Sequence, residues 1–265
     1  MKVAWLTDIH LEFLNKATRA LFVRSLRDAA PDILLISGDI AQAPSLEEHL
    51  TYLAREVMRP IYFVLGNHDF YLGSIAEVRA DVRKFTAQEN GLHWLGAGGV
   101  VRLTNRTNLV GHDGWCDGRL GDYQHSGVRL NDFLLIDELS NLSKEALFET
   151  LNRLGDEASA HFRRTLPEAL ETADHVVVVT HVPPFRESAW YNGRPCDPYW
   201  LPFFSCKAVG DVLSEFMQQY PNRRMTVLCG HTHGGGTSQI LPNLTTVTGP
   251  AEYRSPVIQT IFDFE

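Results

Sequence analysis

Five short apolar runs, each followed at once by polar residues, constrain the fold of this chain more than any other feature. The runs are residues 3–7, 32–37, 60–66, 175–180 and 225–229. Their length and β-branched content are typical of strands buried on both faces, as in a helix-covered parallel sheet. The amphipathic stretches between them predict helices. They lie near residues 17–29, 45–58, 74–88 and 207–219.

Several local signals refine this layout. Ser45-x-x-Glu48 and Ser74-x-x-Glu77 predict capping boxes at the starts of two helices. A longer helical stretch, about 143–172, is expected to break or bend at Pro167. Residues 92–112 predict a hairpin, and the C-terminal sequences TTVTG and VIQTIFDF predict further strands.

The polar clusters after the five runs could converge on one place. They are Asp8-Ile9-His10, Gly38-Asp39, Gly66-Asn67-His68-Asp69, His181 and Gly230-His231-Thr232-His233. In an open α/β sheet, ligands collect outside the carboxyl ends of the strands. Taken singly, an Asp-x-His, a Gly-Asp turn or a lone histidine usually has only a structural role. Their joint occurrence at five strand ends favours one shared site.

The donor types in these clusters predict a transition-metal centre. The candidate ligands are Asp8, His10, Asp39, Asn67, His181, His231 and His233. Imidazole, carboxylate and amide oxygen without thiolate suit Mn, Fe, Co or Zn better than Mg or Ca, which prefer all-oxygen shells. These seven side chains exceed the ligand number of one tetrahedral ion, so two divalent or trivalent ions are expected. Asp39 lies between the two ligand sets and is the natural bridge between ions about 3.5–4 Å apart.

Charge and cysteine usage narrow the partners and the compartment. The formal net charge is −8, and no basic run exceeds two residues, which argues against tight, non-specific binding to long nucleic acid. A nucleic-acid partner therefore stays open but is not favoured, whereas two divalent ions would attract a small phosphoester locally. No run approaches the roughly 20 apolar residues of a membrane span. The four cysteines lack C-x-x-C spacing, and the N-terminus is interpreted as mature protein, so a cytoplasmic location is expected.

One α/β domain over residues 1–265 is the economical interpretation of the chain length, with two loop insertions expected near the site. The insertion at about 113–140 holds Arg119, Tyr123 and His125, which could contact phosphate or sugar. The aromatic insertion at 185–206 holds Trp190 and Tyr191, on which a flat group could stack. Its commoner alternative is a loop that packs on itself or forms a dimer contact.

The ordered set D-x-H, G-D, G-N-H-D, H and G-H-T-H resembles the calcineurin-like metallophosphoesterase superfamily, from residue 8 to residue 233. The resemblance implies a four-layer αββα sandwich, in which two mixed sheets are flanked by helices and a di-metal site lies at the strand ends. It implies that one metal is bound by Asp8, His10, Asp39 and His233. It implies that the other is bound by Asp39, Asn67, His181 and His231.

The same resemblance assigns catalytic roles to two neighbours of Asn67. His68 corresponds to the family's histidine beside the scissile phosphate, and Asp69 to the residue that orients it. Independently, an imidazole of pKa near 6.5 can protonate a leaving alkoxide, and an adjacent carboxylate would fix its tautomer. The alternative is a structural His68 bonded to Asp69.

The expected activity is hydrolysis of a phosphodiester or phosphomonoester by a metal-bridging hydroxide, on a small nucleotide-like or other organic phosphate. The chain lacks the V-D-R-G run of the family's Ser/Thr protein phosphatases, and purple acid phosphatases lack a histidine matching His10. The bacterial-type phosphodiesterase and phosphatase branch remains. The alternatives are a nuclease of the same superfamily, a non-catalytic metal-binding scaffold, and another hydrolase such as an amidase. The sequence leaves the oligomeric state open.

Overall fold

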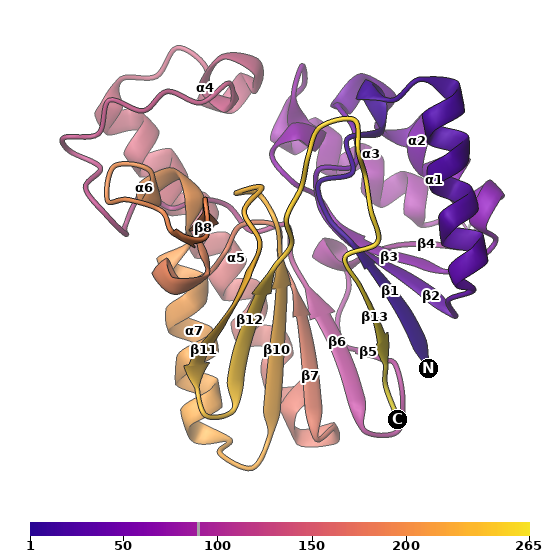
Figure 1. The fold of residues 1–265 in the computed structure, drawn as a ribbon. Helices are drawn as coiled ribbons and strands as arrows, with labels where there is room; N and C mark the ends of the chain where they lie inside the picture. Colours follow the sequence, from indigo (N-terminus) through magenta and orange to yellow (C-terminus); the bar gives the residue numbers. More distant parts are fainter. Residues whose placement is uncertain (89–90) are drawn as a thin grey trace.

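Two β-sheets lie face to face in the computed structural model, which describes residues 1–88 and 91–265 (Figure 1). The first sheet has the strand order β13-β1-β2-β3-β4. Its strands are β1 (Lys2–Leu6), β2 (Ile33–Ser37), β3 (Ile61–Val64), β4 (Leu92–Trp94) and β13 (Thr260–Asp263). β1 to β4 run parallel, and β13 adds an antiparallel edge next to β1.

The second sheet has the order β11-β12-β10-β7-β6-β5. Its strands are β5 (Val101–Arg102), β6 (Thr107–Gly111), β7 (His175–Val179), β10 (Arg224–Cys229), β11 (Gly236–Leu241) and β12 (Leu244–Thr248). β6, β7, β10 and β12 run parallel, while β5 and β11 are antiparallel edges. A separate hairpin pairs β8 (Trp190–Tyr191) with β9 (Arg194–Pro195).

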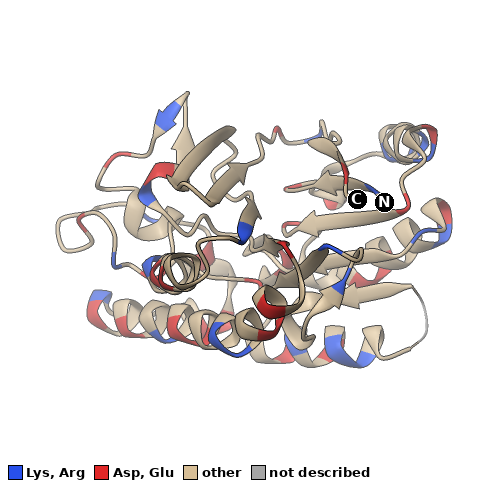
Figure 2. Cartoon of the chain, turned by 90° about the horizontal axis from the view of Figure 1, so that it is seen from below, with Lys and Arg blue, Asp and Glu red and all other residues tan. Residues whose placement is uncertain are grey.

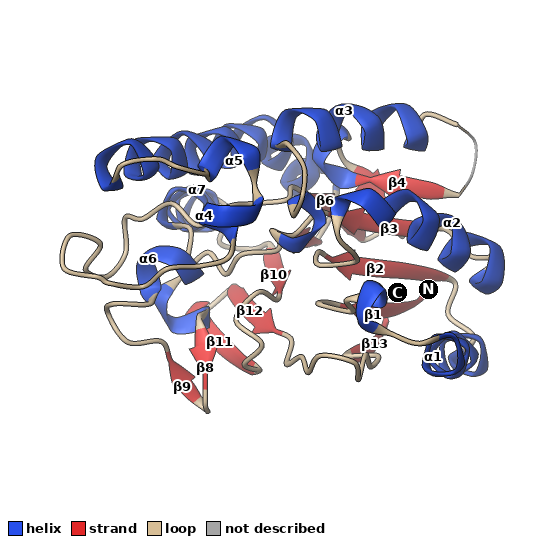
Figure 3. Ribbon diagram, turned by 90° about the horizontal axis from the view of Figure 1, so that it is seen from above, coloured by secondary structure: helices blue, strands red, loops and turns tan. Residues whose placement is uncertain are grey.

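Helices cover the outer faces of both sheets (Figure 3). The longer helices are α1 (Lys16–Ala29), α2 (Leu46–Val57), α3 (Ile75–Thr86), α5 (Lys144–Thr172) and α7 (Lys207–Gln219). The short helices α4 (Asp132–Leu135) and α6 (Leu201–Phe204) belong to loops. Single 3₁₀ turns occupy Leu11–Phe13, Ala43–Ser45, His68–Phe70, Leu95–Ala97, Asp137–Leu139 and Arg186–Ser188.

The alternation of side chains along each strand divides the core into layers. Val3 and Trp5 of β1 belong to the cluster between the two sheets, whereas Ala4 and Leu6 pack in the cluster that includes the helices. Successive residues of a strand face opposite sides, so a strand covered on both sides must be apolar throughout. The four-layer αββα sandwich expected from the sequence is confirmed. A single domain over residues 1–265 stays a prediction.

Three local expectations need correction. Helix α5 continues through Pro167 to Thr172, so the proline does not end it. Ser45 does not cap α2, because its hydroxyl donates to the carbonyl of Gln42. The residues at 92–112 do not form one hairpin: β4 pairs with β3 in the first sheet, and only β5 and β6 pair with each other. The chain crosses between the sheets here, which local residue patterns do not reveal.

The Ser74 cap is present, and the structure adds a second acceptor to it. The Ser74 hydroxyl accepts from the amide of Glu77 at 3.4 Å. The carboxylate of Glu138, distant in sequence, accepts from the amides of Ile75 and Ala76 at 2.7 and 3.0 Å. A carboxylate at this position satisfies free amides and interacts favourably with the helix dipole.

Parallel pairing brings the carboxyl ends of β1, β2 and β3 to the same end of the molecule as those of β7 and β10 (Figure 1). The C-terminal segment, yellow in Figure 1, rises past this end before it returns as β13. Basic and acidic residues are intermixed along the outer helices (Figure 2). Among the described residues, no helix is both long enough and apolar enough to cross a membrane.

Candidate metal centre

Five of the seven candidate ligands lie on left-handed backbone just beyond the strand ends. Their φ angles are 49° for Asp8, 40° for His10, 52° for Asp39, 69° for His231 and 57° for His233. This conformation costs a non-glycine residue roughly 1–2 kcal/mol. Such strain persists where surrounding contacts hold it and is concentrated at functional sites.

Glycines before the ligands let the loops approach one another. Gly38 has φ 92°, and a Cβ atom there would lie 2.5 Å from Nδ1 of His181 and 2.7 Å from the amide nitrogen of Gly66. A Cβ on Gly66 would collide with Asp39, and one on Gly230 with Asp8. The Gly-Asp, Gly-Asn and Gly-His pairs are therefore steric requirements of the site.

The first group of donors consists of Asp8, His10, Asp39 and His233, whose ligand atoms all lie within 4.8 Å of one another. The Nε2 atoms of His10 and His233 are 3.4 Å apart. Oδ2 of Asp39 lies 3.7 Å from Nε2 of His10, and Oδ1 of Asp8 lies 3.5 Å from Nε2 of His233. These are the four residues expected to share one metal.

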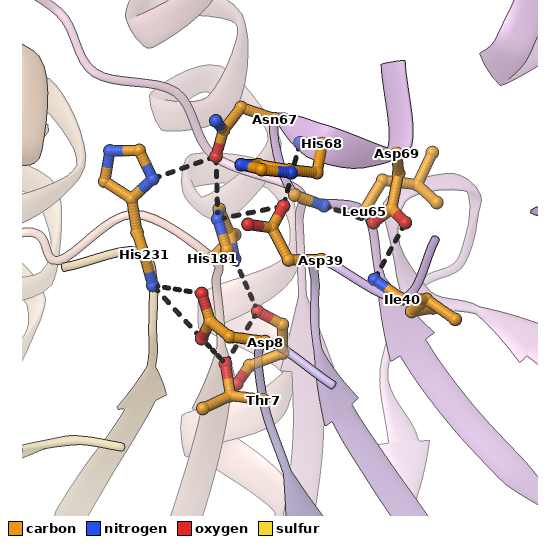
Figure 4. A network of polar contacts seen from close by, with 12 residues as sticks. Thr7, Asp8, Asp39, Ile40, Leu65, Asn67, His68, Asp69, His181 and His231 are labelled. Carbon is orange, nitrogen blue, oxygen red and sulfur yellow. Dashed lines mark hydrogen bonds and ion pairs between the residues drawn. The ribbon is translucent and has the colours of Figure 1, made fainter. Parts of the chain in front are cut away.

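The second group meets at the side-chain oxygen of Asn67 (Figure 4). This Oδ1 atom lies 3.0 Å from Nε2 of His181 and 2.9 Å from Nδ1 of His231. Oδ1 of Asp39 is 3.4 Å from the same nitrogen of His181. Asp39 thus faces the first group with Oδ2 and the second with Oδ1, as a carboxylate that bridged two ions would have to do.

Hydrogen bonds to backbone carbonyls fix the tautomers of two histidines in the second group. Nδ1 of His181 donates to the carbonyl of Ser37 at 2.8 Å, and Nε2 of His231 donates to that of Phe203 at 2.9 Å. Carbonyl oxygens only accept, so these nitrogens carry the hydrogens. Burial lowers the pKa of His181 to about 3, which keeps its ring neutral. In the neutral form in which imidazole binds a metal, the opposite nitrogen of each ring then presents its lone pair to Asn67.

The amide nitrogen of Asn67 is turned away from these lone pairs. It donates to Oδ1 of Asp132 at 2.9 Å and lies 3.3 Å from the hydroxyl of Tyr71. An oxygen and two nitrogens, all acceptors, consequently converge without a hydrogen to share. Such an arrangement is unfavourable unless a cation lies between them, so these donors fit a metal ion.

The carboxylate of Asp39 supports the same conclusion. Burial, followed by the charges of Asp8 and Asp69, raises the pKa of Asp39 well above its usual range. A buried carboxylate beside other carboxylates is stabilised in its ionised form by a nearby cation.

His68 borders both groups. Its backbone amide donates to Oδ1 of Asp39 at 2.9 Å, and its ring stacks on Tyr71 with centroids 4.2 Å apart. Burial and the neighbouring imidazoles, His10 foremost, lower the pKa of His68 to about 2. Its Nδ1 is buried without a hydrogen-bond partner among residues 1–88 and 91–265.

The structure replaces the expected role of Asp69 with another. Oδ1 of Asp69 accepts from the amides of Ile40 and Ala41 at 2.8 and 2.9 Å, and Oδ2 accepts from the amide of Gly66 at 2.7 Å. Both oxygens are engaged by backbone, so Asp69 joins the Asp39 loop to the Asn67 loop and does not orient the His68 ring. Burial raises the pKa of Asp69 to about 8.

A family model described as calcineurin-like phosphoesterase matches residues 1–235. The chain belongs to this family. A UDP-2,3-diacylglucosamine hydrolase from Stenotrophomonas maltophilia is 35% identical over 95 aligned residues; the match covers 31% of this chain and 38% of that protein. One from Yersinia pseudotuberculosis is 29% identical over 148 aligned residues; the match covers 51% of this chain and 57% of that protein. The chain therefore spans about two fifths to three fifths of the length of these curated relatives.

Solved structures share the fold of this phosphoesterase family member. A phosphopantetheinyl hydrolase from Mycobacterium tuberculosis aligns with TM-score 0.64 and 16% identity, over 96% of this chain and 90% of that one. A dimetal phosphatase from Danio rerio aligns with TM-score 0.57 and 14% identity, over 98% and 88%. At these identities the likeness concerns the fold alone.

Three of the expected substrate contacts are engaged by other residues of the chain. Arg119 forms ion pairs with Asp117 and Asp156, and Tyr123 donates its hydroxyl to the carbonyl of Lys144. His125 is 78% exposed and pairs with Asp122. Arg119 and Tyr123 are therefore tied to helix α5, and His125 to its own loop.

The two aromatic candidates behave differently from each other. The indole N–H of Trp190 donates to the hydroxyl of Ser238 at 3.0 Å, so Trp190 anchors its hairpin to β11. Tyr191 lines a cavity of about 280 Å³ together with Asp39, Asn67 and His68. Among the five expected substrate contacts, Tyr191 is therefore the one that lines this cavity beside the metal groups.

Three further residues of this cavity or its border were missed in the sequence. The ring of Tyr253 lies 4.7 Å from that of His10 and 4.8 Å from that of His233. Asp132 holds Asn67, and Oε1 of Glu12 lies 3.7 Å from Nδ1 of His10. Glu12 lies two residues after the predicted ligand His10, so its position in the sequence could have identified it as a neighbour of the site. Asp132 and Tyr253 lie far from the ligand motifs in the sequence, and only the folded chain brings them to the cavity.

Proposed function

We propose that this protein is a binuclear metal-dependent phosphoesterase that hydrolyses a small organic phosphodiester or phosphomonoester. The observation that carries the proposal is the convergence of acceptor atoms around Asn67, beside a second donor group that shares Asp39. Membership of the calcineurin-like phosphoesterase family supports the reaction class. The nucleotide-linked compound in the names of the curated relatives agrees with a small organic phosphate.

The proposed ligands form two sets. Asp8, His10, Asp39 and His233 would hold one ion. Asp39, Asn67, His181 and His231 would hold the other. Bound Mn, Fe, Zn or Co ions lower the pKa of a coordinated water to about 7 and stabilise negative charge on phosphoryl oxygens.

The chain's own residues contribute position and hydrogen bonds. Asp69 fixes the two loops that carry Asp39 and Asn67, which keeps the two ligand sets in register. The imidazole of His68 lines the cavity and would donate to a phosphoryl or leaving-group oxygen. Two divalent ions would outweigh the charges of the ligand carboxylates, so an anionic substrate is attracted despite a net charge of −8.

The proposal includes a cytoplasmic location, which the four free cysteines support. A polymeric nucleic-acid substrate is less favoured, because basic and acidic residues are intermixed along the outer helices.

The test combines metal depletion with a substrate panel. Chelator-treated protein is reloaded separately with Mn, Fe, Zn or Co and assayed on bis-p-nitrophenyl phosphate, p-nitrophenyl phosphate, cyclic nucleotides, nucleoside diphosphate sugars and p-nitrophenyl acetate. We expect phosphoester hydrolysis that returns as bound metal approaches two ions per chain. Hydrolysis of the acetate alone would overturn the proposal, and full activity at one ion per chain would overturn its binuclear part.

A further inference from the structure

A second cavity, of about 200 Å³, adjoins the one over the metal groups. We call it the aromatic cavity; its lining is Tyr191, Asn192, Arg194, Pro195, Cys196, Asp197, Trp200, Phe204 and Thr232. Tyr191, Phe204 and Thr232 also line the cavity that contains Asp39 and His68. A ligand held at the metal groups can therefore extend into the aromatic cavity.

One wall is a hairpin of fixed geometry. Asn192 and Gly193 link β8 to β9 with φ angles of 49° and 74°, the signs required at both centres of a tight two-residue hairpin turn. Trp190 binds Ser238 of β11, and the hydroxyl of Ser238 donates in turn to the carbonyl of Glu187. Adjacent residues of a strand point to opposite sides, so anchoring Trp190 turns Tyr191 toward the cavities.

The other wall is joined to a candidate metal ligand. The rings of Trp200 and Phe204 lie 5.4 Å apart, and Phe204 lies 4.9 Å from the ring of His231. The carbonyl of Phe203 accepts the hydrogen bond that fixes the tautomer of His231. The aromatic wall and the metal donors are thus parts of one connected structure.

The exposed rings of this cavity suit a flat ligand. Tyr191 is 56% exposed and Trp200 43%, so both keep free surface after packing on their own loop. Both rings also line the cavity, unlike that of Tyr199, which is similarly exposed on the same loop. Arg194 and Asp197 add one charge of each sign to the lining, so the rings, and not a net charge, give the cavity its preference.

We propose that the aromatic cavity binds a planar ring carried by the phosphoester substrate. Stacking on Trp200 and Tyr191 holds the ring while the phosphate lies at the metal groups. The reaction at that phosphate rests on the proposed function above, whereas binding of the ring does not require turnover. The substrate class is therefore a phosphoester of a ring-bearing alcohol, with nucleosides and aryl alcohols as its two sources.

Binding tests the cavity without hydrolysis. Dissociation constants of phenylphosphonate and methylphosphonate are measured by calorimetry on the metal-loaded protein. We expect phenylphosphonate to bind about tenfold more tightly, since stacking on an aromatic side chain contributes that order of affinity. Trp200→Ala should reduce the ratio to about twofold, and Tyr191→Ala provides a second variant. Tyr199→Ala is the matched control, because Tyr199 is 51% exposed on the same loop but is not among the lining residues.

Kinetics then separates this inference from the proposed function. Benzyl and ethyl phosphate have leaving alcohols of similar acidity, and thymidine 5′-phosphate tests a nucleoside source. A higher kcat/KM for benzyl than for ethyl phosphate, lost in Trp200→Ala and kept in Tyr199→Ala, supports the cavity. Hydrolysis without ring preference, or a binding preference that survives Trp200→Ala, overturns the cavity and leaves the phosphoesterase standing. A Trp200-dependent binding preference without hydrolysis overturns the activity alone.

Discussion

At the residue scale, the orientation of one amide decides whether the second donor group exists. Asn67 can direct either its oxygen or its nitrogen toward His181 and His231. Asp132 accepts from the amide nitrogen and also from the hydroxyl of Tyr71, at 2.9 and 2.6 Å. Because Asp132 accepts the hydrogen bond from the amide nitrogen of Asn67, the side-chain oxygen of Asn67 is left facing the two histidines, where a metal ion could bind it.

Replacing Asp132 therefore tests a positioning role. We expect Asp132→Ala to lower metal affinity and kcat/KM by about 10–100-fold, as for residues that orient metal ligands. Asp132→Asn, which keeps an acceptor for Tyr71, should recover part of both. Bound metal per chain is measured by elemental analysis, and urea unfolding checks the fold. Normal metal content in a folded Asp132→Ala protein would contradict the role.

As proposed above, His68 takes part in the chemistry and binds no metal ion. We expect His68→Ala to keep near-normal metal content and to lower kcat by at least about a hundredfold, because the N–H donor to a phosphoryl or leaving-group oxygen is lost. Metal analysis and steady-state kinetics on the best phosphoester measure both effects. An unchanged kcat would remove His68 from the mechanism.

At the element scale, the site depends on close approach between loops that follow parallel strands. Gly38 lies between β2 and Asp39, against His181 from the other sheet and Gly66 from the next loop. Its left-handed backbone and its missing side chain are both required there.

A pair of glycine substitutions separates these two requirements. Gly91 has φ +75°, and nothing in residues 1–88 and 91–265 lies within 4 Å of an added Cβ, so we expect Gly91→Ala to carry only the backbone penalty of about 1–2 kcal/mol. Gly38→Ala adds a collision with His181 and Gly66, and we expect a further loss of about 1–3 kcal/mol. Urea unfolding measures both. Equal losses would show that the loops can move apart.

At the scale of the whole molecule, the two sheets bury titratable groups far from the metal centre. His175 begins β7, at the opposite end of the sheet. It contacts the hydroxyl of Thr226 at 2.9 Å and the guanidinium of Arg224 at 3.2 Å. Burial and the charge of Arg224 lower the pKa of His175 to about 4.

This depressed pKa makes stability depend on pH in a defined direction. The unfolded chain takes up a proton at His175 near pH 6.5, whereas the folded chain does so only near pH 4. The contribution to stability is complete above pH about 6.5 and is lost as the pH falls to about 4, by up to about 3 kcal/mol. Urea unfolding of wild type and His175→Gln at several pH values measures it, and metal release common to both cancels in the difference. His125→Gln, at an exposed histidine, is the control. Parallel curves for wild type and His175→Gln would contradict the assignment.

The periodicity of apolar residues was sufficient to predict the strands and helices whose buried faces are apolar. Local sequence patterns failed for three features, and in two of them the deciding partners are distant along the chain. β4 and β5 join different sheets, although residues 92–112 read as one hairpin. Pro167 lies near the end of α5, and the helix continues for five more residues to Thr172. The adjacency of His68 and Asp69 suggested a hydrogen bond, but the backbone amides of Ile40, Ala41 and Gly66 satisfy the carboxylate.

The sequence by itself determined the strand-end motifs, since donor types and glycine positions are written in it. The seven candidate ligands lie in the two groups expected of them, four atoms within 4.8 Å in one and the Asn67 oxygen in the other. Only the tertiary structure decided which neighbours hold those ligands and which loop borders them. Asp132, Tyr253 and the Phe203 carbonyl come from segments far along the chain, and their hydrogen bonds and ring contacts exist only after the sheets have packed.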